Sequence, residues 1–350
     1  MTQKVVVNCR FLTQPVSGVQ RFAIEICKEL KKANLDIIFV APKNIIHKSL
    51  AKQLDVVEIG YFKGHLWEQM ELKLFVAKEK ALLICLCNTA PLFLKNQIIT
   101  IHDLCFLNYP QWFSFYFRKA YSFLIPRIAK KAMHILTVSE TSKKEIIDII
   151  GIDENKISVI YNAVTPIFKS FETKKQKNLS IEGKYILSVS SHHPRKNFER
   201  LVFAFLDLGI TDLKLVIVGN FHKHFKNENI KFSDRVIFKE NVDDRELMAL
   251  YKNAELFVYP SLYEGFGIPI IEAMSLGTQV CISDIPVFRE ICGGYAVYFD
   301  PSSVNEIKES IKLALKKPKE DHTNFLKKFD WQKSAVIVEN KLTELRNRNT

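Results

Sequence analysis

The sequence lacks most of the short patterns that mark metal, redox and membrane-spanning proteins. Its seven cysteines contain no Cys-x-x-Cys pair, so neither a zinc site nor a dithiol redox centre is supported. No apolar run approaches the roughly 20 residues that a membrane-spanning helix needs. There is no signal peptide, no internal repeat and no low-complexity segment, and the cysteine count is odd. These absences predict a protein of the reducing cytoplasm.

The chain carries an excess of positive charge that is unevenly distributed. Its formal net charge is +12, from 50 Lys and Arg and 38 Asp and Glu residues. Residues 1–165 hold 22 basic and 14 acidic residues, a balance of +8, and the remainder hold 28 and 24, a balance of +4. Such an excess attracts nucleic acid, an anionic membrane or a phosphorylated substrate. Because the charges are scattered and no nucleic-acid motif stands out, we expect no nucleic-acid partner.

Strand-like apolar runs alternate with helical patterns along the chain. This alternation is typical of α/β domains, in which helices cover both faces of a parallel sheet. A polar stretch at residues 170–183 reads as a linker between two halves of this kind. Strands are predicted at residues 4–8, 36–40, 81–87, 97–102, 135–139, 156–161, 185–190, 214–219, 235–238, 256–259, 279–283 and 296–299. Helices are predicted at residues 19–32, 118–132, 141–150, 197–208, 246–254, 304–317 and 330–345.

The segment from Tyr259 to Gly277, YPSLYEGFGIPIIEAMSLG, carries the most specific pattern. A loop with two glycines leads into a short helix, in which Pro269 suits the first turn and Gly277 suits the carboxyl-terminal cap. Glu272 lies among apolar helix residues, where a carboxylate needs a partner. Glu264 lies eight residues earlier, on the loop. Two carboxylates spaced in this way around a helix start can bind two sets of sugar hydroxyls.

A second pattern is a basic pair, Arg195 and Lys196, which follows the strand-like run at residues 185–191 and precedes a helix. A strand, a short loop and a helix N-terminus form an anion site. Arg195 can bind two phosphate oxygens at once, and Lys196 adds a point charge. The sequence contains no Asp-x-Asp pattern, with which many sugar transferases hold a metal ion. We therefore expect an anion to be held at this loop by the two protein cations rather than by a metal ion.

The segment 259–277 closely resembles the signature of the retaining GT-B glycosyltransferases of family 4, also called glycosyl transferases group 1. The resemblance extends over nearly the whole chain, and the second half is richer in motifs. It implies an α/β fold of the GT-B type, with two doubly wound Rossmann-like domains facing an interdomain cleft. Residues 1–165 would bind the acceptor, residues 180–329 would bind the nucleotide sugar, and a helix in residues 330–350 would pack back on the first domain. The residues that match are Pro260, Ser261, Glu264, Gly265, Phe266, Gly267, Pro269, Glu272, Ala273, Met274 and Gly277.

The resemblance also implies roles for single residues. Glu272 would bind the ribose diol, Glu264 the donor sugar, and Arg195 with Lys196 the diphosphate. His102 would contact the transferred sugar, because a matching His-Asp pair lies beside the donor sugar and the acceptor in this family. The catalytic residues are then His102, Arg195, Lys196 and Glu264. The donor-binding residues are Gly18, Arg195, Lys196, Val242, Glu264, Gly265, Phe266, Gly267, Ile268 and Glu272.

Two loops of the first half match the family in part. Ser17 and Gly18 follow the first strand where a phosphate-binding loop would lie, although only one glycine is present. We place Ser17 and Asp103 on the acceptor side. Asn162 resembles the Asn of an Asn-Gly-Val turn in the family, with Ala163 in place of the glycine, and is expected to support the hinge.

The sequence thus predicts a metal-independent, retaining glycosyltransferase with no cofactor. It would move a sugar from a nucleotide-diphosphate sugar to a saccharide, or to a lipid-linked saccharide, in bacterial surface polysaccharide synthesis. One alternative is a sugar-nucleotide 2-epimerase of the same architecture, which would need no acceptor. Another is a non-catalytic partner subunit. The intact motifs favour the transferase over both.

The stretch at residues 109–132 interleaves aromatic residues with five cations. Such a composition suits a segment that lies on an anionic membrane, so a cytoplasmic protein peripheral to the inner face of the cell membrane is expected. The same aromatics could instead line the core of the first domain or an acceptor groove. Pro110 and Pro126 are expected to interrupt the stretch, so that it is not one long amphipathic helix.

Overall fold

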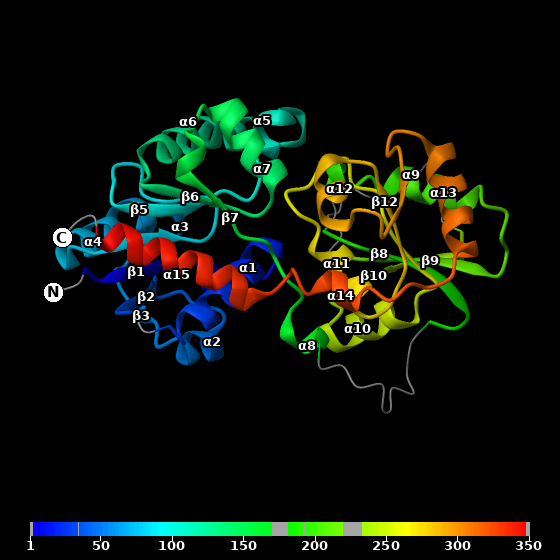
Figure 1. Cartoon of the computed structure of the whole chain (residues 1–350), viewed down its shortest axis with the longest axis horizontal. Coiled ribbons are helices and arrows are strands. Elements are labelled where there is room, and N and C mark those ends of the chain that lie inside the picture. The colour runs from blue at the N-terminus through cyan, green and yellow to red at the C-terminus, as the bar shows by residue number, and fades with distance from the viewer. Residues whose placement is uncertain (1–2, 34, 170–180, 192, 220–232, 348–350) are drawn as a thin grey trace. The chain divides into compact units, whose positions relative to one another are not determined.

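The computed structural model describes residues 3–33, 35–169, 181–191, 193–219 and 233–347. These residues form two compact units (Figure 1). Unit 1 comprises Met1–Asn162 together with Phe329–Thr350, and unit 2 comprises Ala163–Lys328. The predicted linker at residues 170–183 lies almost wholly outside the described residues.

Unit 1 is built on a parallel sheet that, in the described residues, has seven strands in the order β3-β2-β1-β4-β5-β6-β7. Every pairing in it is parallel, which explains why the strands are short apolar runs buried on both faces rather than alternating patterns. The strands are β1 (Val5–Asn8), β2 (Ile37–Ala41), β3 (Val57–Glu58), β4 (Leu82–Cys85), β5 (Gln97–Thr100), β6 (His134–Thr137) and β7 (Ile157–Val159).

Helices cover both faces of this sheet. The C-terminal helix α15 (Trp331–Asn347) runs beside α1 (Gly18–Leu30), as Figure 1 shows, and Ser334 Oγ donates a hydrogen bond to the Tyr161 carbonyl at 2.6 Å. The other helical segments of unit 1 are η1 (Arg10–Thr13), α2 (Lys48–Gln53), α3 (Gly64–Trp67), the π-helical turn η2 (Glu68–Leu72), α4 (Lys73–Glu79), α5 (Cys105–Asn108), η3 (Pro110–Trp112), α6 (Phe115–Lys131), α7 (Glu140–Glu145), the π-helical turn η4 (Ile146–Ile150) and η5 (Glu154–Lys156).

Unit 2 repeats the design with a parallel sheet of six strands in its described part, in the order β10-β9-β8-β11-β12-β13. The order reverses at β8, so the carboxyl ends of β8 and β11 lie at the point where ligands bind in doubly wound sheets. The strands are β8 (Lys184–Val189), β9 (Leu213–Val218), β10 (Val236–Lys239), β11 (Leu256–Tyr259), β12 (Val280–Ser283) and β13 (Val297–Phe299). The helices are α8 (Pro166–Lys169), η6 (Pro194–Lys196), α9 (Phe198–Leu206), α10 (Asp244–Asn253), α11 (Ile268–Ser275), α12 (Pro286–Cys292), α13 (Val304–Lys316) and α14 (Thr323–Leu326).

One sequence-based expectation was wrong, and one helical region was missed. Helix α6 continues through Pro126, which was expected to interrupt it; the buried side chains of Ile125, Ile128 and Ala129 hold both flanks of the proline against the core. Helical segments α2, α3, η2 and α4 were not predicted. Their apolar residues are divided between core and surface, with Trp67 buried and Leu66 52% exposed, so no regular apolar face marks them in the sequence.

Candidate functional site

Three predicted residues meet at the carboxyl ends of β8 and β11 in unit 2. Arg195 and Lys196 lie in η6 after β8, and Glu264 follows β11, which pairs with β8. Arg195 Nη1 donates to Glu264 Oε2 at 3.1 Å, and Lys196 Nζ donates to Glu264 Oε1. Ser261 Oγ also donates to Oε1, at 2.8 Å. The basic pair and the loop glutamate are therefore one cluster, although nearly 70 positions separate them in the chain.

Within the cluster, Glu264 and Lys196 are buried, Arg195 is half-buried, and Glu264 is ionised. Glu264 is 8% exposed and Lys196 is 5% exposed. Burial alone would raise the pKa of Glu264, but the charges of Arg195 and Lys196 outweigh it and lower that pKa to about 2. Two cations against one carboxylate leave one net positive charge in a place shielded from water. Such a charge is suited to a phosphate group, because protein cations act more strongly where water is excluded.

Asn197 fixes the backbone that presents the basic pair. Its φ is +57°, a left-handed conformation that asparagine adopts more readily than most residues. Its Nδ2 donates to the carbonyls of Pro260 and Pro301 at 3.0 and 2.7 Å. A single side chain thereby ties the loop after β8 to the loop after β11 and to the start of the α13 region. The conformation of the loop that carries the two cations is therefore fixed in part by Asn197.

Glu272 lies on α11. It is 7% exposed, and Tyr251 Oη donates to its Oε2 at 3.1 Å. Burial, followed by the charge of Glu272, raises the pKa of Tyr251 well above its ordinary value, so the phenol remains a donor at neutral pH. Gly267 precedes α11 at a φ of +116°, and a Cβ there would lie 3.0 Å from Ile270 and Phe288 side-chain atoms. Helix α11 is thus packed tightly enough to hold Glu272 in place.

The remaining predicted donor residues of unit 2 occupy loops and helix starts. Gly265 and Phe266 are buried in the loop before α11, and Ile268 is the first residue of that helix. Val242 is half-buried and directly precedes Asp243, the residue that caps α10. The predicted proline near the helix start and the left-handed Gly277 after its end are both confirmed.

In unit 1, the predicted residues lie at the carboxyl ends of β1 and β5. His102 follows β5, is 6% exposed, and its Nε2 lies 3.0 Å from the Leu86 carbonyl. Because a carbonyl only accepts, Nε2 carries the proton and Nδ1 is left as an acceptor. Burial lowers the pKa of His102, so the ring is neutral at pH 7 and can accept a hydrogen bond from a hydroxyl. The ring of Phe22, on α1, packs edge-on against it with centroids 4.9 Å apart.

The other three predicted residues of unit 1 shape the same edge of the sheet. Asp103 Oδ1 accepts from the backbone N–H of Cys105 at 3.0 Å and so starts α5. Ser17 is the exposed N-cap of α1, and its N–H donates to Gln20 Oε1 at 3.1 Å. Gly18 is the first residue of α1, where backbone N–H groups face outward.

Several residues that complete the unit 2 site were not assigned a role from sequence. Tyr259 Oη accepts from Lys196 Nζ at 3.0 Å, Ser261 binds Glu264, and Tyr251 binds Glu272. Tyr259 and Ser261 lie within the segment 259–277, so their proximity to Glu264 could have been predicted from that motif. Tyr251 lies on another helix, and no local pattern links it to Glu272. Within the described residues, no cluster of three or more His, Cys, Asp or Glu side chains is placed to hold a metal ion.

Two family models match the chain. The family model described as glycosyl transferases group 1 matches residues 170–328, and the model described as glycosyltransferase family 4 matches residues 16–166. The chain is 33% identical over 268 residues to O-antigen chain mannosyltransferase RfbU of Salmonella typhimurium. The matched region covers 75% of this chain and 73% of that protein. It is 26% identical over 293 residues to serotype-specific mannosyltransferase WbdA of Escherichia coli, spanning 79% of this chain but 34% of that protein.

Solved structures with the same fold include Anabaena Alr3699/HepE in complex with UDP and glucose, with a TM-score of 0.75 at 17% identity over 97% of this chain and 99% of that one. Sucrose-phosphate synthase from Thermosynechococcus elongatus gives a TM-score of 0.73 at 17% identity over 98% and 99%. At 17% identity, the similarity to these two structures shows a shared fold alone. Two parallel α/β units, two family models and a relative at 33% identity agree. The chain therefore belongs to the group 1 glycosyltransferases of family 4 and has their GT-B fold.

Proposed function

We propose that this glycosyltransferase moves a hexose from a nucleotide-diphosphate sugar to a saccharide acceptor, without a metal ion and with retention of anomeric configuration. The observation that carries the proposal is the Arg195–Lys196–Glu264 cluster, with Lys196 and Glu264 buried, at the switch point of the unit 2 sheet. The identity to a chain mannosyltransferase favours mannose as the sugar and polysaccharide synthesis as the setting. Lipid-linked saccharides are the acceptors that such a setting would supply.

The roles follow from charge. Negative charge builds on the leaving diphosphate as the glycosidic bond breaks, so Arg195 and Lys196 stabilise the transition state more than the bound donor. Glu264 holds both cations in place and, with the N–H groups of the loop that follows, would face the donor sugar. Glu272 would accept hydrogen bonds from the ribose diol, with Tyr251 fixing its carboxylate. His102 would accept a hydrogen bond from the transferred sugar through Nδ1.

The anomeric configuration is proposed to be retained, and no residue is assigned as a nucleophile. This combination favours attack by the acceptor on the same face of the sugar from which the diphosphate leaves. In that step the acceptor oxygen forms the new bond to the anomeric carbon while the bond to the diphosphate oxygen breaks. The acceptor proton passes to the departing phosphate oxygen, so no residue of the chain has to be the base. The family resemblance suggests this course.

The test is donor turnover by the purified chain. Nucleotide release would be measured for a panel of nucleotide sugars with and without saccharide acceptors, in the presence and absence of EDTA. The proposal expects acceptor-dependent release from one donor, unaffected by EDTA, and a product whose anomeric proton coupling in NMR shows the donor configuration. Free epimerised sugar would indicate a 2-epimerase, and no turnover of any donor would indicate a non-catalytic subunit.

We further propose that unit 1 docks on an anionic membrane through the exposed face of α6. Phe115 and Phe123 on α6 are 58% and 52% exposed, and Phe93 is 70% exposed, so these rings are not core residues. Cations lie over them, with the Arg127 guanidinium 3.6 Å from the Phe123 ring centroid and Lys131 Nζ 4.9 Å from that of Phe93. Aromatic rings with cations beside them suit the interface between lipid headgroups and chains.

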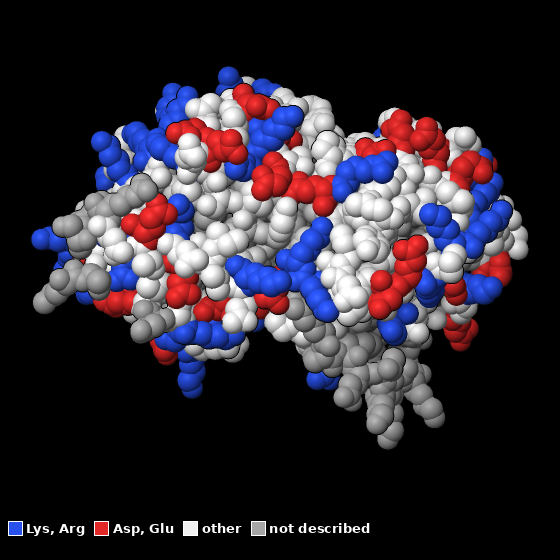
Figure 2. Space-filling model, in the orientation of Figure 1, with Lys and Arg blue, Asp and Glu red and all other residues white. Residues whose placement is uncertain are grey.

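The charge around α6 supports an anionic partner. No Asp or Glu occurs between Asp103 and Glu140, whereas five Lys and Arg residues do. Figure 2 shows Lys and Arg side chains along the border of unit 1 where α6 lies, with Asp and Glu side chains from other segments among them. No helix in the described residues is long and apolar enough to cross a bilayer.

The membrane proposal is tested by co-sedimentation with vesicles. Phosphatidylglycerol vesicles at low salt should bind the chain, and the Phe115→Ser/Phe123→Ser variant should bind less. The matched control is Leu313→Ser, which removes a side chain that is 53% exposed on α13 of unit 2. Equal binding to neutral and anionic vesicles, or equal binding by all variants, would refute the docking face.

A further inference from the structure

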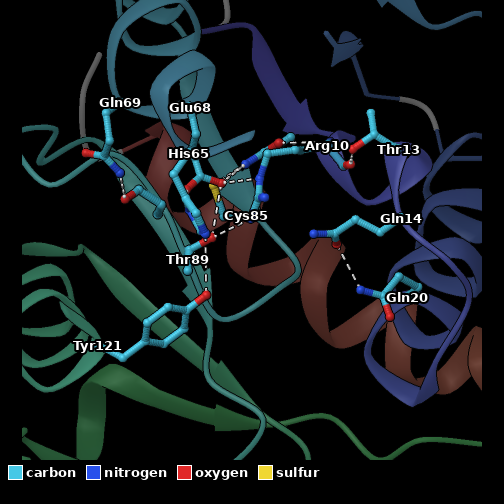
Figure 3. Close-up of polar contacts among 12 residues, drawn as sticks. Arg10, Thr13, Gln14, Gln20, His65, Glu68, Gln69, Cys85, Thr89 and Tyr121 are labelled. Carbon is cyan, nitrogen blue, oxygen red and sulfur yellow. Dashed lines mark hydrogen bonds and ion pairs between the residues drawn. The ribbon is translucent and has the colours of Figure 1, made fainter. Parts of the chain in front are cut away.

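A buried ionic cluster lies at the carboxyl ends of β1 and β4 in unit 1, and no role has been given to it above (Figure 3). Arg10, just after β1, donates from Nε to Glu68 Oε2 at 3.1 Å and from Nη2 to Thr89 Oγ1 at 2.9 Å. Asn8 Nδ2 and Thr89 Oγ1 donate to the same carboxylate oxygen at 3.0 and 3.2 Å. Glu68 is 1% exposed and Arg10 is 8% exposed.

The local structure is arranged to bring Glu68 to this place. Glu68 begins the π-helical turn η2, which interrupts the helix that runs from α3 to α4. Such turns are rare and frequently occur at functional sites. The next residue, Gln69, bonds the Ala90 carbonyl and the Leu92 N–H, so the same turn also holds the loop after β4. A buried ion pair is weak support for stability, because two apolar side chains often serve as well. This one is therefore better explained by what Arg10 can bind.

Arg10 retains side-chain donors that the bonds given above do not use. Two of its five N–H groups make the bonds given above, and among the described residues nothing accepts from Nη1. Tyr121, on α6, lies close enough that the charges of Arg10 and Glu68 act on its pKa, in opposite directions, after burial has raised it. Figure 3 shows the Tyr121 hydroxyl pointing toward His65, whose Nε2 lies 3.5 Å away, on the same side of the cluster as Thr89.

The charge balance selects the kind of ligand. Burial would raise the pKa of Glu68, but its contact with His65 and the charge of Arg10 lower it, so the carboxylate remains ionised at neutral pH. Arg10 and Glu68 therefore cancel. A phosphate at Arg10 would also meet a negative carboxylate, whereas a hydroxyl would meet only oriented donors and acceptors. A neutral polyol suits this cluster better than an anion.

We infer that Arg10 and Tyr121 form a hydroxyl-binding subsite that holds the acceptor saccharide, with Asn8 and Glu68 as positioning residues. This inference rests on the proposed function. It adds which residues bind the acceptor and that the bound part of the acceptor is an uncharged polyol. The subsite lies entirely within unit 1, so its variants leave the proposed donor site of unit 2 unchanged.

The experiment measures binding of methyl α-mannoside by saturation-transfer NMR, in the presence of saturating nucleotide so that the donor site is filled. Arg10→Lys keeps the charge but loses the fixed bond directions, and it should weaken binding by about 10- to 100-fold, the effect of a lost charged hydrogen bond. Tyr121→Phe removes one hydroxyl from a half-buried ring and should weaken it by about 3- to 10-fold. The matched control is Arg289→Lys, which alters an exposed Arg paired with Asp284 in unit 2 and should have no effect.

Each outcome decides the inference. Weaker mannoside binding by Tyr121→Phe, with an unchanged circular dichroism spectrum, supports it even if Arg10→Lys fails to fold. Binding by both variants equal to that of the wild type, or no mannoside binding by the wild type, overturns it. Displacement of the mannoside by inorganic phosphate would identify an anion site instead and would also overturn it. Failure of the proposed function would appear separately, as no turnover of any nucleotide sugar by the wild type.

Discussion

Replacing Glu264 by glutamine should destabilise unit 2 locally, because the change removes the only negative charge of the Arg195–Lys196–Glu264 cluster while keeping its shape. Glutamine resembles the protonated carboxyl. The difference between the ordinary pKa of 4.5 and a value of about 2 corresponds to about 3 kcal/mol, at about 1.4 kcal/mol for each pH unit. Glu264 is 8% exposed, so little of this energy is lost to screening by water.

Hydrogen exchange read by mass spectrometry is the suitable assay, since it reports on single segments. Peptides that cover β11 and α11 should exchange about 100-fold faster in Glu264→Gln at pH 7, because the lost free energy makes local opening of these segments easier. All three tryptophans, Trp67, Trp112 and Trp331, lie in unit 1, so the denaturation midpoint read by their fluorescence should not change. Glu246→Gln is the matched control, because Glu246 pairs with Lys239 in the same unit but is far more exposed.

The pH dependence gives a second reading of the same energy. A carboxyl with a lowered pKa contributes stability above pH 4.5 and loses it as the pH falls from 4.5 to about 2. The advantage of the wild type over Glu264→Gln should therefore shrink across that range. Equal exchange by the two proteins at pH 7, or a difference that persists unchanged to low pH, would refute the account of Glu264 as an ionised anchor for the two cations.

Three further predictions concern the donor site and the histidines. Glu272→Ala should weaken nucleotide binding by about 1.5–3 kcal/mol, measured by calorimetry, and unchanged affinity in a folded variant would count against the ribose role. Arg195→Ala and Lys196→Ala should lower kcat more than they weaken nucleotide binding, and a loss of activity in EDTA that manganese restores would refute the metal-free proposal. His102 and His134 have lowered pKa values, that of His134 about 4, so stability should fall as the pH drops below about 6.5; a flat urea midpoint between pH 7 and 5 would contradict this.

The architecture could be predicted from sequence because its strands are buried on both faces. Runs such as Val5–Asn8 read as short apolar segments, and their alternation with helices identifies parallel sheets. The unpredicted region around Glu68 shows the limit of that signal. Its helix is interrupted by a π-helical turn, and it exposes apolar residues on one side while burying Trp67 on the other. Because the apolar residues are divided in this way, the sequence shows no helical periodicity there.

The candidate site was predicted residue by residue but not as a set of contacts. The motif located Glu264, and the strand–loop–helix pattern located Arg195 and Lys196. Only the pairing of β8 with β11 brings them within hydrogen-bond distance, and a single sequence does not reveal strand order. The role of Arg10 was not predicted for a similar reason, because its partner Glu68 lies on η2, a turn that no sequence pattern indicated.

The path of the chain through the two units has a consequence for the order of folding. Unit 2 is one continuous stretch, Ala163–Lys328, whereas unit 1 is closed by α15, whose Ser334 bonds a carbonyl 173 residues earlier. During synthesis from the N-terminus, unit 2 is complete before the last helix of unit 1 has been made. Until then the α1 surface that α15 covers, including Phe22, stays open to solvent or to chaperones. Loss of the residues from Phe329 onward would accordingly leave unit 2 intact and unit 1 without part of its core.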